Sequence, residues 1–185
     1  MTAPGLQAAA TEGDRDAVRR YLSRFGAQQT PVRLRQTIMA LLDGVPGEVM
    51  WDVGAGSGSI AIEWKIARPG SRVFAIERYE DRCEDIAYNA FAHGVHIDIL
   101  RSELEGAPGI LPAPDLIWLG CPGESEIDLF APLWAQLLPG GWMACNAVST
   151  RGIERMRRAQ QRFGGTLALH ADYDLPRELW IACKD

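Results

Sequence analysis

The sequence has few residues of the kinds that bind metals or build disulfide frameworks. Its 185 residues include only three histidines and four cysteines. The cysteines are Cys83, Cys121, Cys145 and Cys183, which are too far apart in the sequence to form a Cys-x-x-Cys unit. This spacing argues against a structural zinc site and predicts reduced thiols, most of them buried. We therefore expect no bound metal.

Long apolar runs and an excess of basic charge are also missing. No stretch reaches the roughly 18 apolar residues that a membrane-spanning helix needs, and the first residues lack the basic and apolar regions of a signal peptide. The formal net charge of −5 disfavours a nucleic-acid partner, because neutralising phosphates requires a basic surface. These absences predict a cytoplasmic protein that has neither a membrane nor a nucleic acid as partner.

The composition is that of a globular domain, with 47% hydrophobic and 23% charged residues. The length suits one domain of roughly 100–200 residues. Residues 1–30 are expected to form an N-terminal extension with a short helix over Asp14–Phe25, where apolar residues recur at three- and four-residue steps. Residues 31–185 are expected to form the main domain, without linkers or internal repeats.

Expected strands and helices alternate along the main domain. The apolar segments predict strands at 49–53, 72–76, 95–100, 115–120, 141–148, 166–170 and 178–183, and helices from Pro31 and at 59–67, 80–93, 125–137 and 150–163. This alternation predicts an α/β domain with a mainly parallel sheet and helices on both faces. The last two strands are joined too tightly for a crossover helix and must be antiparallel. Such an ending is typical of the Rossmann-like fold of methyltransferases.

A glycine-rich segment between the first expected strand and the next helix is the main functional signal. It reads Trp51-Asp52-Val53-Gly54-Ala55-Gly56-Ser57-Gly58, in which the glycines let the backbone turn sharply and a ligand approach closely. The following helix offers free N–H groups at its N-terminus. Asp52 would repel a pyrophosphate but can bind the ammonium group of a methionine moiety. The alternative interpretation is that Asp52 caps the helix.

A second acid, Glu77, follows the second expected strand. A carboxylate at this place can accept hydrogen bonds from both hydroxyls of a ribose. The alternative is a surface glutamate beside Arg78. Together, the loop, its position after a strand and the downstream acid predict S-adenosylmethionine as the cofactor.

The glycine segment and the residues after it resemble a known family. Ser59-Ile60-Ala61-Ile62-Glu63-Trp64 continues the segment as in the precorrin-6Y C5,15-methyltransferase (decarboxylating) family of cobalamin biosynthesis. These enzymes methylate a precorrin ring and remove a carboxyl group from an acetate side chain. Ala75-Ile76-Glu77-Arg78, Leu138-Pro139-Gly140-Gly141 and Asn146-Ala147-Val148 are also similar. The sequence departs from the family pattern after the fourth expected strand, at Leu119-Gly120-Cys121-Pro122-Gly123, and in the shortened segment between the last two strands.

The resemblance implies a class I S-adenosylmethionine-dependent methyltransferase fold, in which a mostly parallel seven-stranded sheet ends in an antiparallel strand pair. It also implies a precorrin substrate and a homotetramer. It places Thr30 near the methionine end of the cofactor and Glu103 near the adenine. The cofactor-binding residues expected from the loop and the resemblance together are Thr30, Asp52, Gly54, Ala55, Gly56, Ser57, Gly58, Glu77, Arg78, Glu103 and Gly120.

The expected catalytic residues follow from the chemistry of methyl transfer. This transfer depends on the positioning of an in-line nucleophile, so we expect no catalytic triad. Arginines should hold the substrate carboxylates. Arg151, after the fifth strand, is the first candidate, and Arg33 and Arg35 are weaker ones; the alternative at each is a solvated arginine. Asn146, at the end of the same strand, is expected to hydrogen-bond the substrate, unless the backbone satisfies its amide.

Three functions agree with these observations. The first is a decarboxylating precorrin methyltransferase, or the separate methyltransferase half of one. The second is a related class I methyltransferase that acts on another small molecule or on RNA, although the acidic composition disfavours RNA. The third is a non-catalytic cofactor-binding homologue, against which the intact glycine segment with Asp52 and Glu77 argues.

Overall fold

The computed structural model describes residues 30–45, 47–103, 111–120, 128–170 and 177–185. The helix expected over Asp14–Phe25 lies outside these residues, and so does Cys121. Within the described part of the chain, no helix is long and apolar enough to cross a lipid bilayer.

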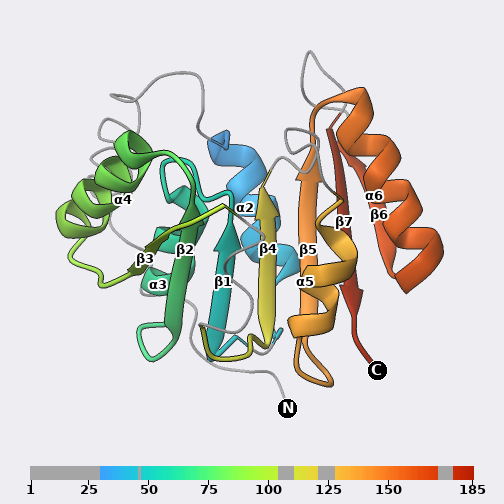
Figure 1. The fold of residues 1–185 in the computed structure, drawn as a ribbon, viewed down its shortest axis with the longest axis horizontal. Coiled ribbons are helices and arrows are strands. Elements are labelled where there is room, and N and C mark those ends of the chain that lie inside the picture. Colours follow the sequence, from blue (N-terminus) through green and yellow to red (C-terminus); the bar gives the residue numbers. More distant parts are fainter. Residues whose placement is uncertain (1–29, 46, 104–110, 121–127, 171–176) are drawn as a thin grey trace.

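Seven strands form one sheet in the order β3-β2-β1-β4-β5-β7-β6 (Figure 1). The strands are β1 (Val49–Val53), β2 (Arg72–Glu77), β3 (Asp98–Arg101), β4 (Leu116–Gly120), β5 (Trp142–Ala147), β6 (Thr166–His170) and β7 (Arg177–Cys183). The described helices are α2 (Val32–Leu41), α3 (Ser59–Ala67), α4 (Glu80–Ala92), α5 (Phe130–Gln136) and α6 (Thr150–Phe163). Strands β1 to β5 pair in parallel, whereas β7 is antiparallel to both β5 and β6. The predicted sheet with its antiparallel end is therefore confirmed.

Two elements begin more than one residue later than predicted. Residues 125–127 of the helix predicted over 125–137 lie outside the described part of the chain, and α5 begins at Phe130, whose N–H donates a hydrogen bond to the carboxylate of Asp128. Strand β3 begins at Asp98, later than predicted, because the N–H of Val95 still bonds back to the last turn of α4.

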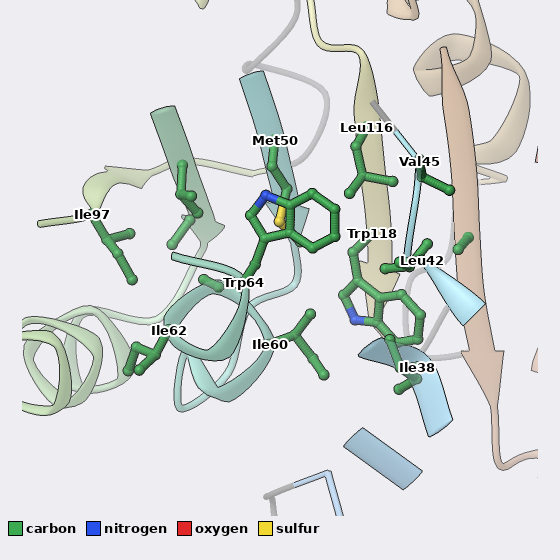
Figure 2. Packing of buried hydrophobic residues seen from close by; sticks show 14 of the residues in the cluster. Ile38, Leu42, Val45, Met50, Ile60, Ile62, Trp64, Ile97, Leu116 and Trp118 are labelled. Carbon is green, nitrogen blue, oxygen red and sulfur yellow. The ribbon is translucent and has the colours of Figure 1, made fainter. Parts of the chain in front are cut away.

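Each face of the sheet has its own hydrophobic cluster. Helices α2, α3 and α4 cover one face, and α5 and α6 cover the other (Figure 1). Figure 2 shows the first cluster, in which Trp64 of α3 and Trp118 of β4 lie among apolar side chains of α2 and β1. The second cluster contains Trp51, Phe130 and Trp180. Successive side chains of a strand point to opposite faces, so the alternation of each strand assigns its residues to one cluster or the other.

The cysteines are less buried than predicted. Of those described, Cys145 is buried in the second cluster, whereas Cys83 is intermediate and Cys183 is exposed. Cys183 ends β7, and Cys83 lies in the first turn of α4, where a helix is still open to solvent. All three are free thiols.

Candidate cofactor site

The glycine segment passes over the carboxyl ends of β1 and β4. Gly54, Gly56 and Gly58 have φ angles of +73°, +59° and +76°, in the left-handed region that favours glycine. A Cβ on Gly54 would lie 3.2 Å from the carbonyl oxygen of Gly120 at the end of β4, and a Cβ on Gly120 only 2.8 Å from that of Gly54. The two backbones approach so closely that neither position has room for a side chain.

Glu77 ends β2 and holds the glycine segment from the side. Its side chain is only 3% exposed, so it is not a surface glutamate. Oε2 accepts a hydrogen bond from the N–H of Gly56 at 3.0 Å, and Oε1 accepts from the N–H groups of Arg78 and Tyr79 at 2.9 and 3.1 Å. The two strongest sequence signals, the loop and the acid after the second strand, therefore meet in one place.

Asp52 lies beneath the segment and is 1% exposed. Its Oδ2 accepts a hydrogen bond from the N–H of Ala61, in the first turn of α3, at 3.0 Å. Burial, with a smaller contribution from the charge of Glu77, raises the pKa of Asp52 from 3.8 to about 7, against the lowering effect of the Ala61 hydrogen bond. This contact agrees with the interpretation that Asp52 anchors the start of α3. Its contact with a methionine ammonium group stays a prediction.

Four neighbouring strands each place their last or next-to-last residue on the same face of the sheet. Asp52 pairs in register with Trp118, and Gly120 with Asn146. By alternation, Asp52, Glu77, Gly120 and Asn146 all lie on the face that α2, α3 and α4 cover. The arrowheads of β1, β4 and β5 point to one edge, where α2 also begins (Figure 1). Thr30, directly before α2, joins the group at this edge.

The chemistry of these groups suits a ligand with hydroxyl and amino groups better than one with phosphates. Two carboxylates lie beside the loop, and Glu77 already binds the Gly56 N–H that a pyrophosphate would need. A Cβ on Gly56 would meet no atom within 4 Å, so the loop is open to a ligand there. The ribose hydroxyls and the ammonium group of S-adenosylmethionine match this arrangement, and the residues present therefore fit this cofactor.

A family model described as "Precorrin methyltransferase domain" matches residues 24–174. The chain belongs to this family. Membership confirms the resemblance seen in the sequence and implies S-adenosylmethionine as the cofactor.

Individual relatives support the same assignment. A precorrin-6Y C(5,15)-methyltransferase (decarboxylating) from Mycobacterium tuberculosis is 36% identical over 146 residues, which are 79% of this chain and 37% of that protein. A protein of the same name from Sinorhizobium sp is 35% identical over 147 residues, covering 79% of this chain and 35% of its own length. The solved C-terminal domain of precorrin-6Y C5,15-methyltransferase from Rhodobacter capsulatus has a TM-score of 0.76 and 27% identity, over 88% of this chain and 95% of that one. The chain thus spans little more than a third of the length of the curated relatives it matches.

Other residues predicted for the cofactor site of this precorrin methyltransferase domain are distributed around the loop. Ala55 packs against the first hydrophobic cluster, and Ser57 is 8% exposed, with a carbonyl that accepts a hydrogen bond from Asn89. Arg78 is exposed, and its guanidinium donates to the hydroxyl of Tyr79. Glu103 is exposed just beyond β3. Within the loop itself, Ala55 is therefore half-buried and Ser57 buried, whereas Arg78 and Glu103 are exposed.

The two predicted catalytic residues lie on different sides of the sheet. Asn146 is 5% exposed on β5 and belongs to the face that contains Asp52 and Glu77. Arg151 is an exposed residue in the first turn of α6, which packs over the opposite face. Both are near the carboxyl edge of β5, but only Asn146 shares a face with the acids.

The structure contradicts the prediction that Arg35 holds a substrate carboxylate. Arg35 is 2% exposed, and its Nε lies 2.5 Å from Oε1 of Glu63 on α3. A guanidinium that is buried and paired in this way is not available to a substrate. Arg33, two residues earlier on α2, is exposed and stays a weaker candidate for holding a substrate carboxylate.

Sequence reasoning missed two polar residues that support the site, the half-buried Glu63 and the buried Asn89. Glu63 pairs with Arg35, and Asn89 of α4 is fully buried and donates from Nδ2 to the carbonyl of Ser57 at 2.9 Å. Both residues stand in apolar stretches of helix, Glu63 between Ile62 and Trp64. A lone polar residue within an apolar helical stripe was the available signal, because burial there requires a hydrogen-bond partner.

Proposed function

We propose that this chain is an S-adenosylmethionine-dependent methyltransferase domain that C-methylates and decarboxylates a precorrin in cobalamin biosynthesis. The observation on which the proposal mainly rests is the contact between Glu77 and Gly56, which places a buried carboxylate beside the open glycine loop. The names of the relatives from Mycobacterium tuberculosis and Sinorhizobium sp supply the substrate class and the reaction.

The chain's own residues serve mainly to bind and orient. When bound, the cofactor supplies a methyl group on a sulfonium; a ring carbon of the precorrin forms the new C–C bond as the S–CH₃ bond breaks. Glu77 accepts hydrogen bonds from the ribose, and Asn146 faces the same side of the sheet as a hydrogen-bonding group for the substrate. Such positioning accounts for most of the rate acceleration expected in methyl transfer.

Decarboxylation needs an electron acceptor and an oriented carboxylate. Methyl transfer leaves a positive charge on the conjugated ring; the bond between the acetate methylene and the carboxyl carbon then breaks, CO₂ leaves, and the electron pair neutralises that charge. Arg151, at the carboxyl edge of β5, is the residue proposed to hold this carboxylate. A homotetramer also stays a prediction, which light scattering on the purified chain tests.

Calorimetric titration with S-adenosylhomocysteine tests the cofactor assignment. Wild type should bind, and Glu77→Ala should lose about 1.5–3 kcal/mol of binding free energy, because a charge-assisted hydrogen bond to the ribose is removed. Glu154→Ala, which removes the same charge from an exposed position on α6, is the matched control and should bind as wild type does. Failure of the wild type to bind would overturn the proposal.

A second assay tests the reaction. Incubation with methyl-labelled S-adenosylmethionine and a precorrin should transfer label to the ring and release CO₂ in equal amounts. Transfer of label without release of CO₂ would support the methyltransferase activity and exclude the decarboxylase activity. Cofactor binding with no transfer to any precorrin would favour a related methyltransferase with another acceptor.

A further inference from the structure

A partly buried ion pair, in which the arginine is buried and the glutamate half-buried, joins the helix that precedes the glycine loop to the helix that follows it. The Nε of Arg35 on α2 donates to Oε1 of Glu63 on α3 at 2.5 Å. The side chains are 3% and 24% exposed, respectively. Buried ion pairs of this kind are weak evidence for stability, because removing two charges from water costs about as much as their attraction returns. The pair therefore needs an explanation other than stability.

A second contact of Arg35 explains why the ion pair is present. Its Nη1 donates to the carbonyl oxygen of Thr30 at 2.5 Å, while its backbone N–H donates to the carbonyl of Pro31 at 2.9 Å. The planar guanidinium thus points one nitrogen at Glu63 and another at the chain just before α2. Only arginine offers donors in such a rigid fork.

Glu63 is in turn fixed relative to the cofactor loop. It stands one turn after Ser59, at the start of α3, and the first turn of that helix is held by the hydrogen bond from Ala61 to Asp52. A continuous series of contacts therefore runs from Thr30 through Arg35 and Glu63 to α3 and the base of the loop. Helix α2 begins at the edge of the sheet to which the arrowhead of β1 points, and β1 leads directly into the loop (Figure 1).

We propose that Arg35 and Glu63 are positioning residues that hold the backbone of Thr30 against α3 and so fix one wall of the cofactor site. The inference rests on the proposed cofactor function. It assigns neither residue a contact with the ligand. It explains why a buried arginine is paired with a half-buried glutamate on the face that contains Asp52 and Glu77.

The decisive variant replaces both charges, as Arg35→Met with Glu63→Met. Apolar side chains of similar volume can replace a buried pair with little loss of stability, so this double variant should unfold near the wild-type midpoint. It has no donor for the Thr30 carbonyl, and its dissociation constant for S-adenosylhomocysteine should rise about tenfold. A role in stability alone would leave that constant unchanged.

The matched control is the ion pair on the other face, between Arg157 of α6 and Glu178 of β7. Arg157→Met with Glu178→Met removes the same two charges from the opposite face of the sheet and should leave the affinity within twofold of wild type. If the first double variant does not fold, Arg35→Lys provides the test, because a single ammonium replaces the fork. Arg35→Lys should bind several-fold more weakly.

Two readouts separate the inference from the function on which it rests. Wild type that binds S-adenosylhomocysteine, with a folded double variant that binds equally well, overturns the positioning role alone. Wild type that does not bind overturns the proposed function. In that case, hydrogen exchange at residues 31–36 decides the inference: unchanged protection in the double variant would overturn it, and faster exchange there but not in α6 would support it.

Discussion

The two faces of the sheet are held together by different kinds of contact. On the face that α2, α3 and α4 cover, polar groups are buried among the apolar ones, including Arg35, Asp52 and Asn89. On the face that α5 and α6 cover, aromatic rings dominate: Trp134 stacks on Phe163 with ring centroids 4.7 Å apart. In the ion pair on that second face, the side chain of Glu178 is 7% exposed but that of Arg157 is 60% exposed, so the arginine lies at the surface.

The difference separates stability from positioning. Apolar burial is favourable but not directional, whereas a buried hydrogen bond or ion pair holds its partners in one geometry. The α5–α6 face, as we call the second one, should therefore contribute mainly free energy of unfolding. The face over α2, α3 and α4 should contribute the shape of the cofactor site.

The largest expected effect is on the α5–α6 face. Trp180 is 1% exposed, and its ring lies edge-on to Phe130 at a centroid distance of 5.6 Å. Trp180→Ala should lower the free energy of unfolding by about 3–5 kcal/mol, measured by urea titration, because it leaves a cavity in a packed core. Trp134→Ala, at a half-buried ring, is the comparison and should cost less. Weaker S-adenosylhomocysteine binding by folded Trp180→Ala protein would show that the faces are not independent.

The next effect concerns Asp52, the buried acid on the face that α2, α3 and α4 cover. The pKa of Asp52 is raised from 3.8 to about 7, so the folded state holds a proton that the unfolded state releases. Its contribution to stability is complete below pH 4 and is lost as the pH rises to about 7. Asp52→Asn keeps an acceptor for the Ala61 N–H and should be more stable than wild type at pH 8, by at most about 4 kcal/mol. Thermal unfolding of both proteins from pH 4 to pH 8 measures the difference, and parallel curves would contradict it.

The smallest expected effect on stability comes from two glycine substitutions, which separate stability from ligand binding most clearly. Gly56 and Gly140 have φ angles of +59° and +75°, and a Cβ on either would meet no atom within 4 Å. Alanine at each should therefore cost a similar 1–2 kcal/mol of backbone strain, roughly. Only Gly56→Ala places its methyl group beside the candidate ligand, so only this variant should lose affinity for S-adenosylhomocysteine, roughly tenfold. Equal affinities in the two variants would place the ligand elsewhere.

Much of the fold and the centre of the site could be predicted from local sequence patterns. The bounds of β1, α3 and α6 are as expected, because each has a clear apolar period and a glycine or cap at its end. The glycine segment and Glu77 were found because their spacing is short and their residue types are restricted. Arg35 was assigned wrongly, since its exposure depends on a partner 28 residues away.

The sequence by itself determined the strands, the helices, the antiparallel end of the sheet and the acidic, glycine-rich character of the loop. These properties depend on the steric limits of glycine and on periods of two and 3.6 residues, which neighbouring residues decide. Only the tertiary structure decided that Glu77 accepts a hydrogen bond from the N–H of Gly56. It also decided that Asn146 lies on the same face of the sheet as Glu77, whereas Arg151 does not. The two contacts of Arg35, with Glu63 and with the carbonyl of Thr30, were likewise decided by packing. A buried charge takes whichever partner packing brings within reach, and no local pattern specifies that partner.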